Sequence, residues 1–204
     1  GAIDFDTTET KFEFTHDMRI KNIHPLIRND AHKLIEECMI AANICAARFI
    51  ARNKIPSLYR VHEPPDDDKL EELRGFLGEL GLRMGAPSRK ISPKDYATLS
   101  STIKKREDIH LIQTLMLRSM QQAAYRPDNI GHFGLALKHY AHFTSPIRRY
   151  PDLLVHRAIK HIIQKRNKRD FPYDQNKMNT FGEHCSANER RVGKECRSRW
   201  LPYH

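Results

Sequence analysis

The chain has 204 residues, and its 35 lysines and arginines against 25 aspartates and glutamates give a formal net charge of +10. This length suits one ordinary domain or most of a larger one, and no apolar stretch approaches the ~20 residues of a membrane span. The chain begins at Gly1, without the charged and apolar regions of a signal peptide. We therefore expect a soluble fragment or excised domain with an anionic partner.

The opening of the chain predicts an extended segment followed by a strong helix. Apolar side chains within residues 2–15 indicate strand material. A helix is expected over 30–52, with Asn29 or Asp30 as its N-cap. Six apolar side chains recur at helical spacing on this helix and predict its buried face: Leu34, Cys38, Ala41, Ala42, Cys45 and Phe49.

Helices and short extended pieces follow in alternation. The expected elements are an extended piece over 57–62, helices over 66–80, 93–104, 107–124 and 146–165, a turn over 127–129 followed by a strand before residue 140, and a last helix from 177. Gly81 is expected to end the 66–80 helix, because glycine adopts the left-handed conformation that follows many helices. Pro151 is expected to kink the 146–165 helix or to restart it after one turn.

Neither the acids nor the thiols predict a metal site. Asp66, Asp67 and Asp68 follow two prolines, where acids suit the first turn of a helix better than a two-metal cluster, whose ligands must converge. Cys38 and Cys45 lie too far apart along one helix to form a disulfide, and no Cys-x-x-Cys occurs. We expect buried thiols, a reducing cytoplasm and no metal ligands in this chain.

The most informative segment is the basic, aromatic-rich stretch 131–157. Ser145-Pro146 predicts a helix start, because serine is a preferred N-cap and proline is tolerated at the first helical position. Free amides and the guanidiniums of Arg148 and Arg149 would then form a phosphate site. The aromatic side chains ahead of it offer stacking faces for bases or fill a core beneath the helix start: Phe133, His139, Tyr140, His142 and Phe143.

Positive charge is concentrated toward the end of the chain. From Pro146 onward there are fourteen basic and six acidic side chains, which leaves +8 of the chain's +10 in this part. Such a distribution raises the local concentration of nucleic acid and makes binding fall steeply with salt. The sequence therefore predicts a nucleic-acid partner.

The segment HFGLALKHYAHFTSPIRRYPDLLVHRAIK closely resembles the signature of the RNB catalytic domain of the ribonuclease II/ribonuclease R family. The blocks RNDAHKLIEECMIAANICAARF, LYRVHEPP and QTLMLRSMQQAAY also resemble the family, in its order. The resemblance covers residues 1–191 and is closer to ribonuclease R. It implies the C-terminal portion of an α+β domain, predominantly helical, with a few strands near the N-terminus and around 131–143.

The resemblance implies a 3′–5′ exoribonuclease that hydrolyses single-stranded RNA to nucleoside 5′-monophosphates with Mg2+ held by aspartates. Those aspartates lie N-terminal to the region that matches this chain. We therefore expect a fragment that lacks the metal ligands. Its expected partners are RNA and either the missing N-terminal half of the domain or a second copy of itself, because the lost strands would expose apolar faces such as those of Leu111, Leu115 and Met116.

Several positions carry over by motif. Arg148 matches the family arginine that binds phosphate beside the scissile bond, where positive charge stabilises the developing oxyanion. Glu36 matches a glutamate near the terminal nucleotides, which can accept a hydrogen bond from a ribose 2′-hydroxyl. Phe5 matches an aromatic that stacks on the 3′-terminal bases, and Arg149 and Tyr150 are expected RNA contacts within the same motif as Arg148.

Other side chains of these motifs are expected to support the site. Asp152 and His156 lie four residues apart, at the spacing of a helical pair, and are expected to build its frame with Arg157. Tyr59 and His62 are expected to be structural, with contacts to RNA as the alternative.

Residues 192–204 depart from the family. There the family continues through a helix rich in Ala, Asp and Glu with a further functional glutamate, whereas this chain reads VGKECRSRWLPYH and offers only Glu195. A frameshifted or truncated reading frame would produce such a tail. Two alternatives to an exoribonuclease stay open: a non-catalytic RNA-binding remnant or partner protein, and a structural basic helical domain.

Overall fold

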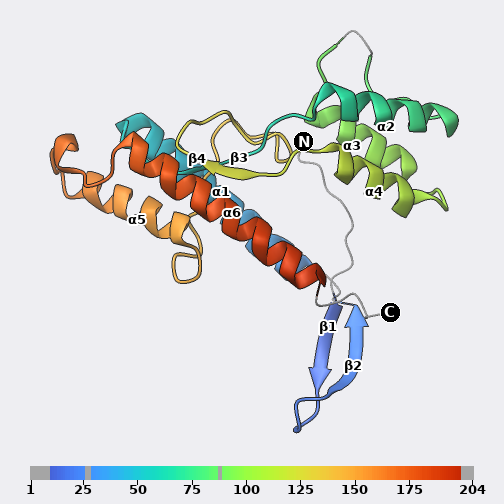
Figure 1. The fold of residues 1–204 in the computed structure, drawn as a ribbon, viewed down its shortest axis with the longest axis horizontal. Coiled ribbons are helices and arrows are strands. Elements are labelled where there is room, and N and C mark those ends of the chain that lie inside the picture. The colour runs from blue at the N-terminus through green and yellow to red at the C-terminus, as the bar shows by residue number, and fades with distance from the viewer. Residues whose placement is uncertain (1–9, 26–28, 87–88, 199–204) are drawn as a thin grey trace.

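The computed structural model of the protein describes residues 10–25, 29–86 and 89–198 (Figure 1). Helices predominate and the strands are few, which confirms the α+β prediction. The elements in chain order are β1 (Thr10–Phe14), β2 (Ile20–Pro25), α1 (Asp30–Asn53), β3 (Tyr59–Val61), α2 (Asp67–Glu79), α3 (Pro93–Ile103), α4 (Ile109–Ser119), β4 (Ala124–Arg126), α5 (Tyr150–Ile163), the 3-10 turn η1 (Lys168–Asp170) and α6 (Gln175–Ser198).

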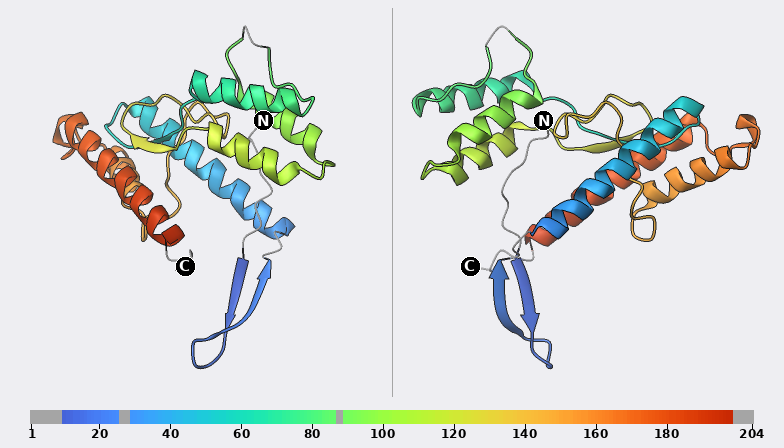
Figure 2. Two further views of the ribbon diagram at one scale, coloured as in Figure 1. Left: turned by 45° about the vertical axis from the view of Figure 1, so that its right-hand side comes forward. Right: turned by 180° about the vertical axis from the view of Figure 1, so that it is seen from behind.

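The first two strands form an antiparallel hairpin that pairs Thr10 with Pro25. Figures 1 and 2 show this hairpin projecting away from the helices, and β2 is exposed along its whole length. The hairpin therefore adds little to the core of the described residues.

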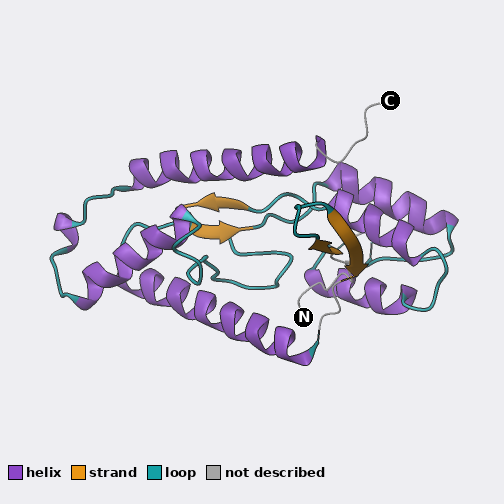
Figure 3. Ribbon diagram, turned by 90° about the horizontal axis from the view of Figure 1, so that it is seen from below, coloured by secondary structure: helices purple, strands orange, loops and turns teal. Residues whose placement is uncertain are grey.

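The central core lies around the short antiparallel pair of β3 and β4. Figure 3 shows this pair between the two longest helices, α1 and α6. α1 packs on α5, and α6 packs on β4. The buried side chains of this core come from distant parts of the chain: Ala46, Ala47 and Ile50 of α1, Tyr59 and Val61 of β3, and Val155 and Ala158 of α5.

Helices α2, α3 and α4 form a second, separate core. The acids at 66–68 begin α2 as predicted, with Asp67 and Asp68 in its first turn. The Tyr96 hydroxyl, fully buried on α3, lies 2.8 Å from the Ser119 hydroxyl at the end of α4.

Among the described residues, no helix is both long and apolar enough to cross a membrane.

The predicted buried face of α1 is wrong. Leu34 is 65% exposed and Cys38 and Cys45 are also exposed, whereas Asn43 and Ala46 are buried. The apolar periodicity predicted one stripe of α1 as the buried face, but α5 packs against the alanine-rich side of α1. Small side chains on that side let the two helices approach closely. The two thiols are therefore not core side chains.

Three further expectations need correction. α4 ends at Ser119 rather than near residue 124, because residues 124–126 pair with β3 instead of continuing the helix. Around 131–143 the structure has two isolated bridges at His132 rather than a strand, since Gly131 and Ala136 both have positive φ. Met116 is fully buried rather than exposed, whereas Leu111 is 52% exposed.

Gly182 sets how closely α6 approaches β4. A Cβ at this position would lie 2.5 Å from the backbone oxygen of Tyr125 and 3.2 Å from a methyl carbon of Leu58. Because a backbone oxygen cannot move aside as a flexible side chain does, Gly182→Ala should destabilise the protein by about 2 kcal/mol. Urea denaturation would measure this loss.

Gly75 provides the control, because it also lies within a helix but a Cβ there would meet nothing within 4 Å. Gly75→Ala should stabilise the protein by roughly 0.5–1 kcal/mol, since alanine is the better helix former. Equal effects of the two substitutions would contradict the packing role of Gly182.

Candidate functional site

The two arginines of the SPIRRY motif lie in a single turn that precedes α5. The amides of Arg148 and Arg149 both donate to the Ser145 carbonyl, at 3.3 and 3.1 Å, and Arg149 then adopts an extended conformation as the N-cap. The prediction that the helix begins at Ser145-Pro146 is wrong. Pro151 is the proline that occupies the first turn of the helix, and the helix starts there as the restart alternative predicted.

Asp152 fixes this 145–149 turn. Its side chain is fully buried, and Oδ1 accepts hydrogen bonds from the Ser145 amide and from the Arg149 guanidinium, both at 2.8 Å. Asp152 therefore pairs with the turn and not with His156 as predicted. His156 instead donates from Nε2 to the Phe143 carbonyl at 2.8 Å and stacks on the Phe143 ring at 4.2 Å.

Arg148 and Arg149 differ in solvent exposure and in ion pairing. The Arg149 side chain is only 23% exposed and is paired with Asp152, which makes it a structural group. Arg148 is exposed, and no described acidic side chain forms an ion pair with it. Tyr150 is 42% exposed, and its ring contacts Phe181 edge to face at 5.6 Å. Of the two guanidiniums, Arg148 is the one that faces solvent.

Five rings follow one another from His62 to Tyr125, and we call them the ring row. Ring centroids are separated by 5.1 Å between His62 and His132, 5.4 Å between His132 and Tyr140, 5.8 Å between Tyr140 and His142, and 5.6 Å between His142 and Tyr125. These rings pack mostly against one another. This arrangement favours the core interpretation of Tyr140 and His142 over the stacking interpretation.

The other aromatic side chains of this region also make contacts within the protein. Phe133 contacts the buried Tyr96 ring edge to face at 5.9 Å and so joins the segment to the α2–α4 core. His139 lies 2.7 Å from the Asn129 side chain through Nδ1. His62 is buried, and its Nδ1 accepts from the Gly134 amide at 2.8 Å, which supports a structural role.

An ion pair closes one end of the ring row. Arg60 of β3 bonds to Glu189 of α6 at 2.6 Å and lies over the Tyr125 ring, 4.6 Å from its centroid. The Tyr125 hydroxyl donates to Glu189 at 3.0 Å and lies 2.8 Å from Nδ1 of His142. Both carboxylate oxygens of Glu189 are thereby engaged.

Burial and positive charge keep the histidines of this row neutral. Burial, followed by the Arg149 and Arg60 guanidiniums, lowers the pKa of His142 to about 3. Burial, followed by His62 and Arg60, lowers the pKa of His132 to about 4. Burial also raises the pKa of the Tyr125 phenol. At neutral pH the charges of this region are therefore those of its arginines and of the carboxylates that pair with them.

Sequence reasoning missed the side chain that links α1 to this segment. Asn43 is buried, accepts from the Phe143 amide at 2.9 Å and donates to the Tyr140 hydroxyl at 3.1 Å. A polar residue within an alanine-rich helical stretch is a signal that could have identified it. Glu36 lies in the second turn of the same helix, half-buried, and Phe5 lies outside the described residues, as does the side chain of Glu195.

The described residues do not fit a Mg2+ site. Among them, no three His, Cys, Asp or Glu side chains come together as metal ligands. Of the two carboxylates nearest the ring row and the turn, Glu189 is bound through both oxygens by Arg60 and Tyr125. Asp152 is bound through Oδ1 by Ser145 and Arg149, and its Oδ2 is buried without a hydrogen-bond partner.

The family model described as the RNB domain matches residues 1–165. Ribonuclease R from Vibrio cholerae is 54% identical over 98% of this chain, and the match covers 26% of that protein. The chain thus spans about a quarter of the length of this curated relative.

Solved structures agree with this match. Mycoplasma genitalium RNase R in complex with ribose-methylated single-stranded RNA has a TM-score of 0.86 at 27% identity, and the match covers 95% of this chain and 31% of that one. The same protein in complex with double-stranded RNA gives a TM-score of 0.87. Yeast Ssd1, a pseudonuclease, is 25% identical with a TM-score of 0.65, over 76% of this chain and 19% of its own.

Proposed function

Because this chain belongs to the RNB domain family, we propose that it is part of a ribonuclease R-type 3′–5′ exoribonuclease, in which Arg148 binds a phosphate of single-stranded RNA. The relatives named ribonuclease R and the neighbouring structures with bound RNA support this proposal. We place the protein in the cytoplasm, with the remainder of the RNB domain as its structural partner.

The observation that carries the proposal is the contrast between the two arginines. A fully buried aspartate holds Arg149, and through the Ser145 amide it also holds the turn that presents Arg148 to solvent. Because the backbone of this turn is held in place, the Arg148 side chain starts from a fixed position, and its planar guanidinium can bind two oxygens of one phosphate. Its positive charge would stabilise the negative charge that develops on a phosphate oxygen during hydrolysis.

The side chains that hold the metal of such an enzyme would lie outside the described residues. Mg2+ polarises a phosphoryl oxygen and activates water when it is bound. In this chain, Arg148 would orient the phosphate, and Glu36 and Phe5 would contact the ribose and base near the 3′ end, with Tyr150 beside them.

Arg148→Ala should weaken binding of single-stranded RNA about 10-fold, because it removes a charge-assisted, bidentate phosphate contact. The slope of log Kobs against log salt concentration should fall by ~0.7, which is the contribution of one phosphate contact on a single strand. Fluorescence anisotropy with a labelled 16-nucleotide RNA across a salt series would measure both.

Two variants control for charge alone. Arg83 is exposed in the loop after α2, far along the chain from the turn, and Arg83→Ala removes the same charge. It should change affinity less than twofold. Arg148→Lys keeps the charge without the planar fork and should give an intermediate loss. Equal losses in Arg83→Ala and Arg148→Ala would refute a phosphate site at Arg148.

A non-catalytic RNA-binding protein is the second candidate. It is favoured by the lack of a metal-ligand cluster among the described residues and by the similarity to yeast Ssd1, a pseudonuclease. Incubation of this chain together with the remainder of the RNB domain, 5′-labelled single-stranded RNA and Mg2+ distinguishes the two. Shortening from the 3′ end that Arg148→Ala abolishes would support the enzyme, and intact RNA with Arg148-dependent binding would support the non-catalytic candidate for this chain.

A further inference from the structure

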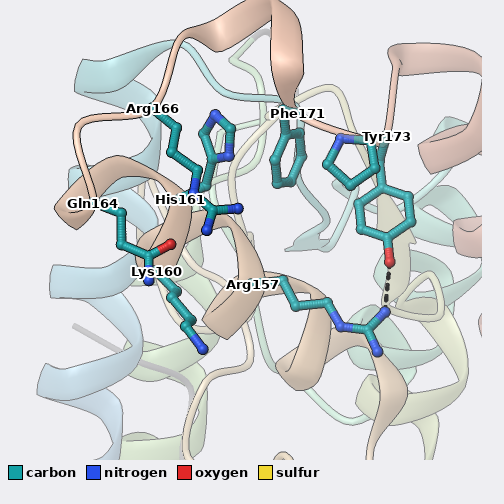
Figure 4. Close-up of a pocket in the computed structure, with 8 residues that line it drawn as sticks. Arg157, Lys160, His161, Gln164, Arg166, Phe171 and Tyr173 are labelled. Atoms are coloured by element: carbon teal, nitrogen blue, oxygen red, sulfur yellow. Dashed lines mark hydrogen bonds between the residues drawn. The ribbon is translucent and has the colours of Figure 1, made fainter.

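A basic cavity lies at the other end of α5 from Arg148. Its volume is about 360 Å³, and it opens between the last turns of α5 and the loop that leads to α6 (Figure 4). The helix contributes Arg157, Lys160 and His161, and the loop contributes Arg166, Phe171 and Tyr173. Arg157 and Lys160 lie within the family segment of residues 132–160, and the other residues that line the cavity lie beyond it.

Three cationic side chains line the cavity, and no acidic side chain does. Arg157 donates to the Tyr173 hydroxyl, as Figure 4 shows, and its guanidinium carbon lies 5.9 Å from the centroid of that ring. Lys160 and Arg166 are exposed and form no ion pair with any described residue. Such a set of cations repels itself unless an anion compensates it.

The wall of the cavity is already ordered. His161 is only 6% exposed, and its Nε2 donates to the Asn167 carbonyl at 2.9 Å, which ties the loop to the helix. The Phe171 ring contacts the His161 ring at 5.1 Å and the Tyr173 ring at 5.4 Å, in both cases edge to face. Aromatic side chains beside cations are what single-stranded nucleic acids use as stacking surfaces and phosphate contacts.

We propose that this cavity is a second RNA-binding site, which takes a phosphate and base of the same single strand whose other phosphate lies at Arg148. The inference rests on the proposed function. Tyr150 and Arg157 lie seven residues apart on α5, hence on one face of the helix, and the Arg157 guanidinium carbon lies 6.0 Å from the Tyr150 ring centroid. From Tyr150 to Lys160 the helix rises ~15 Å, so only a strand of several nucleotides can contact both sites.

The test compares two double variants. Lys160→Ala combined with Arg166→Ala removes the two unpaired cations of the cavity, whereas Lys168→Ala combined with Arg169→Ala removes two exposed cations of η1 that do not line it. All four side chains are exposed, and thermal melts would verify that both variants fold. Anisotropy would then measure the affinity of each variant for a 4-nucleotide and a 16-nucleotide RNA.

We expect the cavity variant to bind the 16-nucleotide RNA about 10-fold more weakly, with its salt slope reduced by ~1.4, and to bind the 4-nucleotide RNA within twofold of the parent chain. The control variant should stay within twofold for both. Equal losses in the two double variants, or no loss in either, would overturn the proposal.

Arg148→Ala separates this inference from the proposed function. If Arg148→Ala has no effect and the cavity variant still weakens binding of the long RNA, the phosphate role of Arg148 fails and the cavity site stands. A different outcome is that the cavity variant loses affinity for adenosine 5′-monophosphate but binds the 16-nucleotide RNA as tightly as the parent chain. The cavity would then be a mononucleotide site, and the proposed RNA contact would be refuted.

Discussion

Acidification from pH 7 to pH 4 is expected to destabilise the central core. His142 and His132 titrate in the folded protein with pKa values of about 3 and about 4, whereas both titrate near 6.5 in the unfolded chain. Between pH 6.5 and 4 the unfolded chain therefore binds more protons than the folded protein. Stability is greatest above pH 6.5 and falls as the pH decreases through this window.

The expected loss of stability is large, because protonation of His142 and protonation of His132 both favour the unfolded chain. Each fully shifted group contributes up to ~1.4 kcal/mol per pH unit, and since neither ring is completely buried we expect about 3 kcal/mol in total by pH 4. Burial also lowers the pKa of His62, the next ring of the row, which adds to the same trend.

Urea denaturation at pH 7, 6, 5 and 4 would measure this dependence. His142→Gln should flatten the profile, even if it lowers the stability at pH 7. A constant free energy of unfolding from pH 7 to pH 5 would show that these histidines are not held neutral by the fold.

Removal of the buried carboxylate at position 152 should be the most destabilising single substitution at the site. Asp152→Ala leaves the Arg149 guanidinium with no described acidic partner in a largely buried position and leaves the Ser145 amide without its acceptor. Breaking a buried ion pair in this way costs about 3–5 kcal/mol. Thermal and urea denaturation would measure the loss.

Asp152→Asn refines this test, because it keeps the volume and one carbonyl oxygen but removes the charge. We expect an intermediate loss of stability and an RNA affinity reduced toward that of Arg148→Ala, since the 145–149 turn would no longer be fixed. Asp170→Ala, at an exposed acid in η1, should change stability by less than about 0.5 kcal/mol. Melting of Asp152→Ala within a degree of the parent chain would contradict the role assigned to this carboxylate.

The candidate site was only partly predictable. The SPIRRY motif pointed to Arg148, but it gave Arg148 and Arg149 the same role, and the structure separates them. Asn43, Arg60 and Glu189, which engage the surrounding segment and its rings, lie far from the motif along the chain. A local pattern cannot show which distant polar side chain will satisfy a buried amide or guanidinium.

By itself the sequence determined the helical elements and the family. Caps, proline and glycine are local signals, so Asn29 correctly begins α1, the three acids at 66–68 correctly mark the start of α2, and the four motif blocks indicated the RNB domain. Only the tertiary structure decided that α5 packs on Ala46 and Ala47 rather than on the Leu34 side of α1, and that Asp152 turns toward Ser145 rather than His156. Both outcomes depend on which surfaces meet in space, because packing and the pairing of buried polar groups are settled between segments that no local pattern connects.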